Sequence, residues 1–215
     1  MIKAIAFDMD GVLIEAKDWH YQALNRALGL FGCQISRHDH LTTFDGLPTK
    51  RKLQMLSAEG KIPAELHEFI NELKQLYTME IVSVSCKPRF GHEYALSRLH
   101  AQGYQLAVCS NSIRSTIDMM MRRAALEPYL AFTVSNQDVS RAKPDPEMYL
   151  QAIARFGVAA HECLVVEDNE NGIRAARASG AQVLEVDDVD DVTYDRIAAR
   201  IGLLDQSVIG QAVAA

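Results

Sequence analysis

The fold of this chain is decided by residues 2–13, which read Ile2-Lys3-Ala4-Ile5-Ala6-Phe7-Asp8-Met9-Asp10-Gly11-Val12-Leu13. Residues 2–7 are mostly apolar without clean alternation, which is the pattern of a strand buried on both faces. Two acids follow at once, and Gly11 indicates a turn. In an open α/β sheet, ligands bind beyond the carboxyl ends of the strands. This stretch therefore predicts a central strand that delivers two carboxylates to a binding edge.

Further along the chain, strand-like and helix-like stretches alternate. Apolar runs predict strands at residues 105–109, 132–134, 163–166 and 182–186, and apolar residues at helical spacing predict helices at 113–125, 146–156 and 172–178. This order is typical of a parallel sheet with crossover helices. We therefore expect an α/β core with a doubly wound parallel sheet.

The alternation is interrupted after the first strand. Residues 15–88 contain no convincing core strand, and their apolar spacing predicts three amphipathic helices at 17–30, 48–57 and 64–77. Pro88 and Gly91 predict a linker back to the sheet. We expect a small all-helical domain at residues 15–88, inserted into a core domain of residues 1–14 and 89–215.

Composition excludes several classes of protein. The 215 residues are 48% hydrophobic and 23% charged, as in ordinary globular domains. Lys and Arg total 22 against 28 Asp and Glu, and the net charge of −6 argues against a nucleic-acid binder. The apolar runs are far shorter than the ~20 residues of a spanning helix and too short for a signal peptide, so we expect no membrane partner. Four cysteines without CxxC spacing predict a reducing, cytoplasmic setting.

The acid pair Asp8 and Asp10 has two interpretations. The two side chains start on one face of the strand, and such close carboxylates repel each other unless a cation or a proton intervenes. Mg²⁺, which prefers oxygen ligands, would resolve that conflict. Asp and Gly are also common in turns, so the pair alone leaves a metal site and a polar turn open.

Polar residues also follow three other predicted strands. Ser110 and Asn111 could hold phosphate oxygens at a helix start, or simply cap that helix. Lys143 is a point charge suited to a phosphate or an acidic nucleophile, or else an exposed surface lysine. Glu167 and Asp168 form a second acidic pair, which could also cap a helix. Because these groups meet at one sheet edge, together they favour a phosphate site.

This ordered set of motifs resembles the haloacid dehalogenase superfamily, in particular its phosphatase and phosphomutase members with a helical cap. The matching motifs are Asp8-Met9-Asp10-Gly11, Ser110-Asn111, Lys143-Pro144, and Glu167-Asp168 with Gly172. They span most of the chain, and they look most like the β-phosphoglucomutase and phosphoglycolate phosphatase branch. The resemblance implies a Rossmann-like core and a cap inserted after the first strand.

The resemblance also implies catalytic roles. Asp8 would be the nucleophile that forms an aspartyl phosphate, and Asp10 would act as general acid and then as general base. Lys143 would offset charge and orient Asp8. Ser110, with help from Asn111, would bind the transferring phosphoryl group.

The metal ligands implied by the resemblance are Asp8, the main-chain carbonyl of Asp10, and Asp168, with Glu167 binding directly or through water. Four acids and a substrate phosphate in one pocket need cations, and Mg²⁺ together with Lys143 would supply them. We therefore expect Mg²⁺ as the cofactor and a small phosphorylated substrate as the partner.

Substrate choice is expected to lie in the cap. His20, Lys50 and Arg51 are candidates to face the site, although His20 also fits a polar position on a cap helix and residues 50–52 also fit a solvated basic helix start. The chain has Glu15-Ala16 where mutase relatives tend to carry Asp followed by Ser or Thr. It has Thr49 where they tend to carry arginine. These departures weaken the case for a phosphoglucose mutase.

The expected function is a Mg²⁺-dependent phosphohydrolase, acting as a monomer on a small phosphorylated metabolite, with sugar phosphates as candidates. The alternative is a sugar phosphomutase of the β-phosphoglucomutase type, distinguished by its product. A receiver-like signalling module would be shorter and lack a cap. The complete acid, hydroxyl and lysine set disfavours a binding scaffold without activity, and Asp10 disfavours a dehalogenase.

Overall fold

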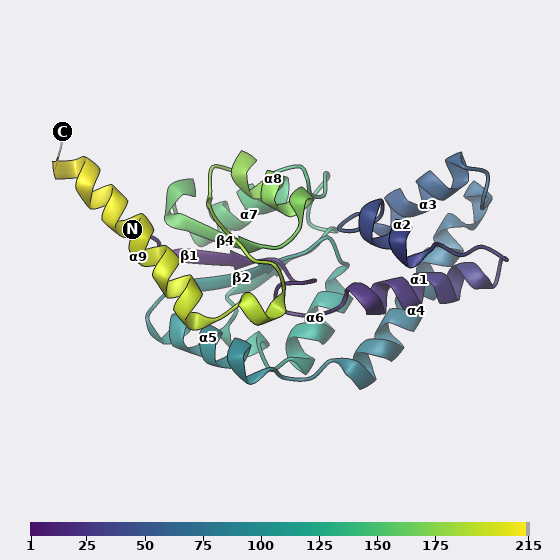
Figure 1. Ribbon diagram of the computed structural model, residues 1–215, viewed down its shortest axis with the longest axis horizontal. Helices are drawn as coiled ribbons and strands as arrows, with labels where there is room; N and C mark the ends of the chain where they lie inside the picture. The colour runs from purple at the N-terminus through teal and green to yellow at the C-terminus, as the bar shows by residue number, and fades with distance from the viewer. Residues whose placement is uncertain (214–215) are drawn as a thin grey trace.

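In the computed structural model, which describes the backbone of residues 1–213 and the side chains of residues 1–206, a five-stranded parallel sheet has the strand order β3-β2-β1-β4-β5 (Figure 1). The strands are β1 (Ala4–Phe7), β2 (Gln105–Cys109), β3 (Phe132–Val134), β4 (Cys163–Glu167) and β5 (Gln182–Glu185). The predicted parallel α/β sheet is confirmed. Its order reverses between β1 and β4, which is the point where such sheets bind ligands.

Helices cover both faces of the sheet. They are α5 (Phe90–Ala101), α6 (Arg114–Arg123), α7 (Glu147–Phe156), α8 (Glu170–Ala178) and α9 (Tyr194–Val213), with 3-10 turns η2 (Glu127–Tyr129), η3 (Ala160–Glu162) and η4 (Val189–Asp191). In β1, Ile5 and Phe7 pack toward α5, α6 and α9, whereas Ala4 and Ala6 pack toward α7 and α8. All four are fully buried, because successive side chains of a strand point to opposite faces and both faces are covered.

The segment between β1 and α5 forms a helical unit beside the sheet (Figure 1). Its elements are α1 (Lys17–Gly29), α2 (Arg37–Thr42), α3 (Thr49–Ala58), η1 (Ala64–Leu66) and α4 (His67–Ser85). The unit has its own buried apolar cluster, which includes Leu24, Leu28, Leu56 and Ile70. In contrast, Val82 near the end of α4 packs into the cluster that covers the sheet. The predicted helical insert is therefore present, while its boundaries at residues 15 and 88 stay a prediction.

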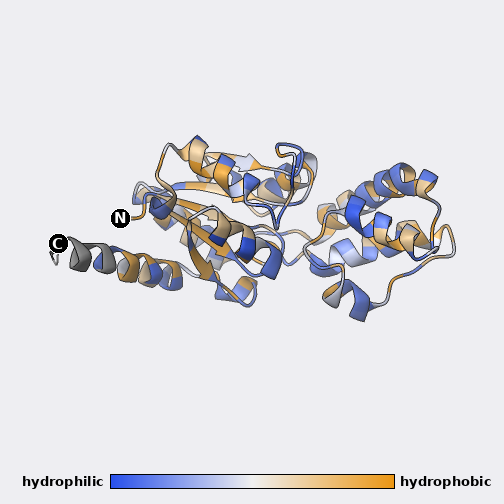
Figure 2. Cartoon of the chain, turned by 90° about the horizontal axis from the view of Figure 1, so that it is seen from above, coloured by the Kyte–Doolittle hydropathy of each residue, from blue (hydrophilic) through white to orange (hydrophobic). Residues whose placement is uncertain are grey.

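The strands of the sheet are mainly hydrophobic, whereas the helices of both parts of the molecule carry both hydrophobic and hydrophilic residues (Figure 2). Cys109 and Cys163 are buried in strands, and all four cysteines are free. The cytoplasmic setting stays a prediction. None of the helices in the described part of the chain has the length and apolar character needed to cross a membrane.

Three helices were not predicted from the pattern, namely α2, α5 and α9. The predicted return linker is wrong at Gly91, which lies in the first turn of α5. The apolar pattern of α5 is weakened by His92, a buried polar side chain whose ring nitrogens contact the carbonyl oxygens of Leu13 and Val189 at 3.1 and 2.7 Å. Residues distant in sequence therefore satisfy the hydrogen-bonding groups of His92, although local spacing assigns this side chain to the surface.

Leu28 and Leu30 provide a test of the separate core of the helical unit. Leu28 is fully buried, whereas Leu30 is 63% exposed at the end of the same helix. Leu28→Ala should lower the free energy of unfolding by about 2–5 kcal/mol, because it leaves a cavity in the apolar cluster. Leu30→Ala should change it by no more than about 0.5 kcal/mol. Urea denaturation followed by circular dichroism measures both, and equal losses would contradict this packing.

Candidate active site

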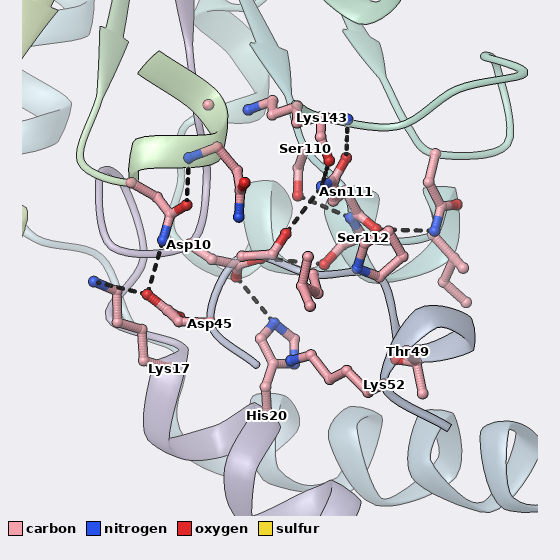
Figure 3. A pocket seen from close by; sticks show the side chains of 18 of the residues that line it. Asp10, Lys17, His20, Asp45, Thr49, Lys52, Ser110, Asn111, Ser112 and Lys143 are labelled. Atoms are coloured by element: carbon pink, nitrogen blue, oxygen red, sulfur yellow. Dashed lines mark hydrogen bonds and ion pairs between the residues drawn. The ribbon is translucent and has the colours of Figure 1, made fainter. Parts of the chain in front are cut away.

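The candidate site is a pocket where the carboxyl ends of β1, β2 and β4 face the helical unit. Side chains from both parts of the molecule line it (Figure 3). Those from the sheet edge are Asp8, Asp10, Ser110, Asn111, Lys143 and Glu167, and those from the helical unit include His20, Lys50, Lys52 and Lys74. Most of the predicted site residues therefore meet in one place.

A tight loop after β1 places the first acid pair. The carbonyl oxygen of Met9 accepts hydrogen bonds from the backbone N–H groups of Leu13 and Ile14 at 3.0 and 2.9 Å. Gly11 has φ +97°, and a Cβ at this position would lie 2.2 Å from Oδ2 of Asp168. Glycine is therefore required on two grounds, its left-handed backbone and the close approach of the second acid pair.

The ammonium group of Lys143 is the centre of the buried part of the site. Its Nζ donates to Oδ1 of Asp8 at 2.6 Å, to Oε1 of Glu167 at 2.6 Å, and to the carbonyl oxygen of Cys109 at 2.8 Å. Burial opposes the charge on Lys143, but the two carboxylates raise its pKa above the ordinary value. Because an ammonium has three donors, all of them are used within the protein. Lys143 therefore orients Asp8 and balances charge.

Glu167 is held by several partners at once. Its Oε1 also accepts from the hydroxyl of Tyr149 at 2.6 Å, and its Oε2 accepts from the backbone N–H groups of Asp168 and Asn169 at 3.2 and 3.4 Å. The side chain is fully buried, and a Cβ at Gly172 would lie 1.7 Å from Oε1. Both carboxylate oxygens therefore already have partners, which makes Glu167 a support for Lys143.

Three carboxylates form a cluster that fits a divalent cation. Oxygens of Asp8, Glu167 and Asp168 lie within 4.8 Å of one another. Burial raises the pKa of Asp168 to about 6, although the ammonium of Lys17 lies 2.8 Å from its Oδ2, and Oδ1 of Asp168 is buried without a hydrogen-bond partner. Burial and the charge of Glu167 also raise the pKa of Asp8. A hard cation with oxygen ligands would favour the ionised form of these acids.

Asp10 points away from this cluster, toward the helical unit. Its Oδ1 lies 3.1 Å from Nε2 of His20, and its Oδ2 accepts from the hydroxyl of Ser112 at 3.2 Å (Figure 3). Nδ1 of His20 lies 3.3 Å from Nζ of Lys74. Since an ammonium only donates, Nδ1 must accept, and Nε2–H therefore donates to Asp10. Burial alone would raise the pKa of Asp10, but His20 and Lys74 lower it.

Ser110 and Asn111 lie in the loop between β2 and α6. Ser110 is buried, and its hydroxyl accepts from the backbone N–H of Ser112 at 3.0 Å. The side-chain amide of Asn111 donates to the carbonyl oxygens of Gly46 and Lys143 at 3.0 and 3.3 Å and accepts from the backbone N–H of Lys143 at 3.1 Å. Asn111 therefore ties the loop to the helical unit and to the Lys143 segment.

The candidates in the helical unit differ in position. His20 contacts Asp10, and Lys50 is exposed but lines the pocket. Arg51 is exposed and is not among the residues that line the pocket, because α3 directs Lys52 rather than Arg51 towards the site. The neighbouring Lys52 is buried and lines the pocket instead.

Sequence reasoning missed several residues of this pocket, namely Lys17, Asp45, Lys52, Lys74, Ser112 and Asn169. A signal for two of them was present. Lys74 lies four residues after Ile70 and four before Thr78, and both neighbours are fully buried. Lys52 lies four residues before the buried Leu56. A lysine on the buried side of a helix indicates a polar site inside the fold.

The sequence of this chain matches a known protein family. The family model described as haloacid dehalogenase-like hydrolase matches residues 5–186. The chain therefore belongs to the haloacid dehalogenase-like hydrolase family, as its motifs predicted. It is thus an enzyme of a hydrolase family whose named relatives include phosphatases, and members of this family generally use Mg²⁺.

Individual relatives agree with this assignment. The phosphorylated carbohydrates phosphatase of Thermotoga maritima is 28% identical over 184 residues, which cover 84% of this chain and 83% of the relative. The phosphoglycolate phosphatase of Nitrosospira multiformis is 28% identical over 186 residues, which cover 85% and 82%. The crystal structure of β-phosphoglucomutase from Clostridium difficile is similar in fold, with a TM-score of 0.83, 20% identity, and coverage of 97% and 100%.

Gly172→Ala tests the buried ion pairs. The added methyl group would occupy the position of Oε1 of Glu167, so Glu167 must move away from Lys143. We expect the free energy of unfolding to fall by about 3 kcal/mol or more. Gly91→Ala is the matched control, because a Cβ there meets nothing within 4 Å and alanine favours a helix. Chemical denaturation measures both variants, and an unchanged Gly172→Ala protein would contradict the arrangement.

Proposed function

We propose that this chain is a Mg²⁺-dependent phosphohydrolase that acts on a small phosphorylated metabolite through an aspartyl phosphate on Asp8. The observation that carries the proposal is the hydrogen bond of the buried Lys143 to Asp8, in a pocket that Asp10 also lines and beside the acidic cluster that includes Asp168. Sugar phosphates are the favoured substrates, since the relative from Thermotoga maritima is named for phosphorylated carbohydrates. We expect the enzyme to act as a monomer, without nucleic acid or membrane.

Asp8 is the nucleophile in this proposal. Lys143 holds one carboxylate oxygen of Asp8 in place, so attack on phosphorus needs little reorganisation of the side chain. The new bond joins a carboxylate oxygen to phosphorus, and the bond between phosphorus and the leaving oxygen breaks. The leaving oxygen takes its proton from Asp10.

Asp10 supplies that proton from the side of the helical unit, where His20 and Ser112 hold its two oxygens. Without substrate, the neighbouring groups lower the pKa of Asp10, chiefly His20, against the effect of burial. Entry of an anionic phosphate raises the pKa of a nearby acid and favours its protonated form. After the first step, the ionised Asp10 takes a proton from water, which attacks phosphorus, releases phosphate and restores Asp8.

The metal ligands in this proposal are the carboxylates of Asp8 and Asp168 and the main-chain carbonyl of Asp10. Glu167 would bind through water, because its oxygens already have partners. When bound, Mg²⁺ would offset the negative charge on the transferring phosphoryl group. Ser110 and the backbone N–H groups at the start of α6 would bind the phosphoryl oxygens, in a loop that Asn111 fixes.

The alternative is a sugar phosphomutase, in which a hydroxyl group of a sugar phosphate rather than water accepts the phosphoryl group. The same Asp8 and Asp10 chemistry would serve it. Thr49 lines the pocket where mutase relatives tend to carry arginine, which disfavours this alternative. The product distinguishes the two, because a mutase isomerises a phosphosugar without net release of phosphate.

Asp8→Asn should abolish turnover. The amide cannot act as the nucleophile, so the release of phosphate should fall at least about a thousandfold, while the circular dichroism spectrum stays that of the folded protein. Phosphate release from a panel of sugar phosphates, nucleotides and phosphoglycolate, with Mg²⁺ present, measures the effect. Normal turnover by this variant would contradict the role of Asp8.

The loss of activity on removal of the metal should be fully reversible. Chelation should abolish phosphate release, and added Mg²⁺ should restore it. Mg²⁺ should also raise the Tm of the protein, because a ligand that binds the folded state stabilises it, and Asp168→Asn should remove most of that rise. Asp195→Asn is the control, since Asp195 is exposed on α9. Full activity in excess chelator, or an unchanged Mg²⁺ effect in Asp168→Asn, would count against the metal site.

A further inference from the structure

A lysine of the helical unit contacts one of the acids that would hold the metal ion. Lys17 is the first residue of α1, and its Nζ lies 2.8 Å from Oδ2 of Asp168. The side chain of Asp168 is fully buried, whereas that of Lys17 is 33% exposed. Lys17 therefore reaches inward from the rim of the pocket to the carboxylate cluster that Asp168 shares with Asp8 and Glu167.

The start of a helix is an unfavourable place for a cation. The N-terminus of a helix carries a partial positive charge, which favours acids rather than lysine in the first turn. Ala16, which precedes α1, provides no side-chain cap. Lys17 therefore finds its compensating charge outside α1, in Asp168 across the pocket.

Two contacts guide Lys17 toward Asp168. The carbonyl oxygen of Lys17 lies 3.2 Å from Nε2 of the buried His40, and this nitrogen must donate because a carbonyl oxygen only accepts. Cε of Lys17 would lie 2.8 Å from a Cβ at position 11, so the lysine stem passes over the bare backbone of Gly11. The ion pair is therefore part of the close packing that requires glycine at this position.

The ammonium of Lys17 stays charged in this setting. Burial opposes its charge, but Asp168, Asp45 and Asp8 raise its pKa above the ordinary value. Lys17 lies on the Oδ2 side of Asp168, while Oδ1 is buried without a hydrogen-bond partner among the described residues. A metal ion bound by Asp168 would share this carboxylate with Lys17, and two cations so close repel each other.

Asp45 offers the ammonium of Lys17 a second acceptor. Oδ2 of Asp45 lies 3.9 Å from Nζ of Lys17 and accepts from the side-chain amide of Asn169 at 2.9 Å (Figure 3). Asp45 and Lys17 are both partly exposed, and ion pairs that water reaches are weak and exchangeable. Lys17 can therefore turn from Asp168 toward Asp45 without losing every carboxylate partner.

We propose that Lys17 is an internal competitor of the metal ion for Asp168. Its ammonium compensates Asp168 in the metal-free protein, and it gives up this contact for Asp45 when Mg²⁺ binds. The inference rests on the metal site of the proposed function and adds to it a residue that lowers metal affinity. Lys17 touches neither the reacting atoms nor the metal ion in this role, so it acts through Asp168.

Lys17→Met should tighten the binding of Mg²⁺, because methionine keeps an apolar stem and removes the competing charge. Isothermal titration with MgCl₂ alone, at about pH 8 where protons compete least for the carboxylates, should show a Kd at least about tenfold lower than that of the wild-type chain. Lys87→Met is the matched control, since Lys87 is exposed and lies outside the pocket. It should keep the wild-type Kd. An unchanged or higher Kd in Lys17→Met would overturn the proposal.

Thermal unfolding separates this role from a merely structural one. Without metal, Lys17→Met should have a lower Tm than the wild-type chain, because Asp168 loses its counter-ion. Saturating Mg²⁺ should then raise the Tm of the variant by more than it raises that of the wild-type chain. A Tm deficit of the same size with and without Mg²⁺ would show that Lys17 only supports the fold, and would overturn the competition.

Asp45→Asn tests the alternative acceptor, since the amide can still accept from Asn169. This variant should weaken Mg²⁺ binding in the wild-type background, where Lys17 stays on Asp168, and much less in the Lys17→Met background. An equal effect in both backgrounds would overturn the part of Asp45.

The same titrations distinguish a failure of this inference from a failure of the metal site. Asp168→Asn in the Lys17→Met background should abolish the gain in affinity, which ties the gain to this carboxylate. Equal Mg²⁺ affinities of the wild-type chain and Lys17→Met would overturn the competition while the metal site stands. Absence of Mg²⁺ binding by both proteins would overturn the metal site of the proposed function, and the competition with it.

Discussion

The site depends on one buried ammonium group, that of Lys143. Its three hydrogen bonds join Asp8 after β1, Cys109 at the end of β2 and Glu167 at the end of β4, so a single side chain ties three adjacent strand ends together. The cost of burying this charge is offset only if all three acceptors stay in place. The same constraint requires glycine at position 172, because Glu167 occupies the space that a Cβ there would need.

Charged side chains line both walls of the pocket. The sheet edge carries the acids Asp8, Glu167 and Asp168 within 4.8 Å of one another, whereas the helical unit presents Lys52 and Lys74. In the function that we propose, the acids of the sheet edge would hold the metal ion beside the transferring phosphoryl group.

The helical unit combines a packing role with a binding role in the same helices. In α4, the residues that face inward recur every four positions, with Ile70 in the apolar cluster and Lys74 at the pocket. Val82, further along the same stripe, packs against the sheet domain. One helix therefore stabilises the insert, joins it to the core and carries a cation to the site, which explains why the insert is held close to the sheet edge.

The sequence by itself determined the parallel sheet, the helical insert and the order of the acid pairs, the hydroxyl, the amide and the lysine, because strand burial and motif spacing are local properties. It also made His20 a candidate for the site, while a polar position on a cap helix stayed open. The tertiary structure decided that Lys52 rather than Arg51 lines the pocket, that Lys74 reaches His20 across 54 positions of sequence, and that Phe90–Ala101 is a helix around the buried His92. These features depend on partners that are distant along the chain, and periodicity within a segment carries no information about them.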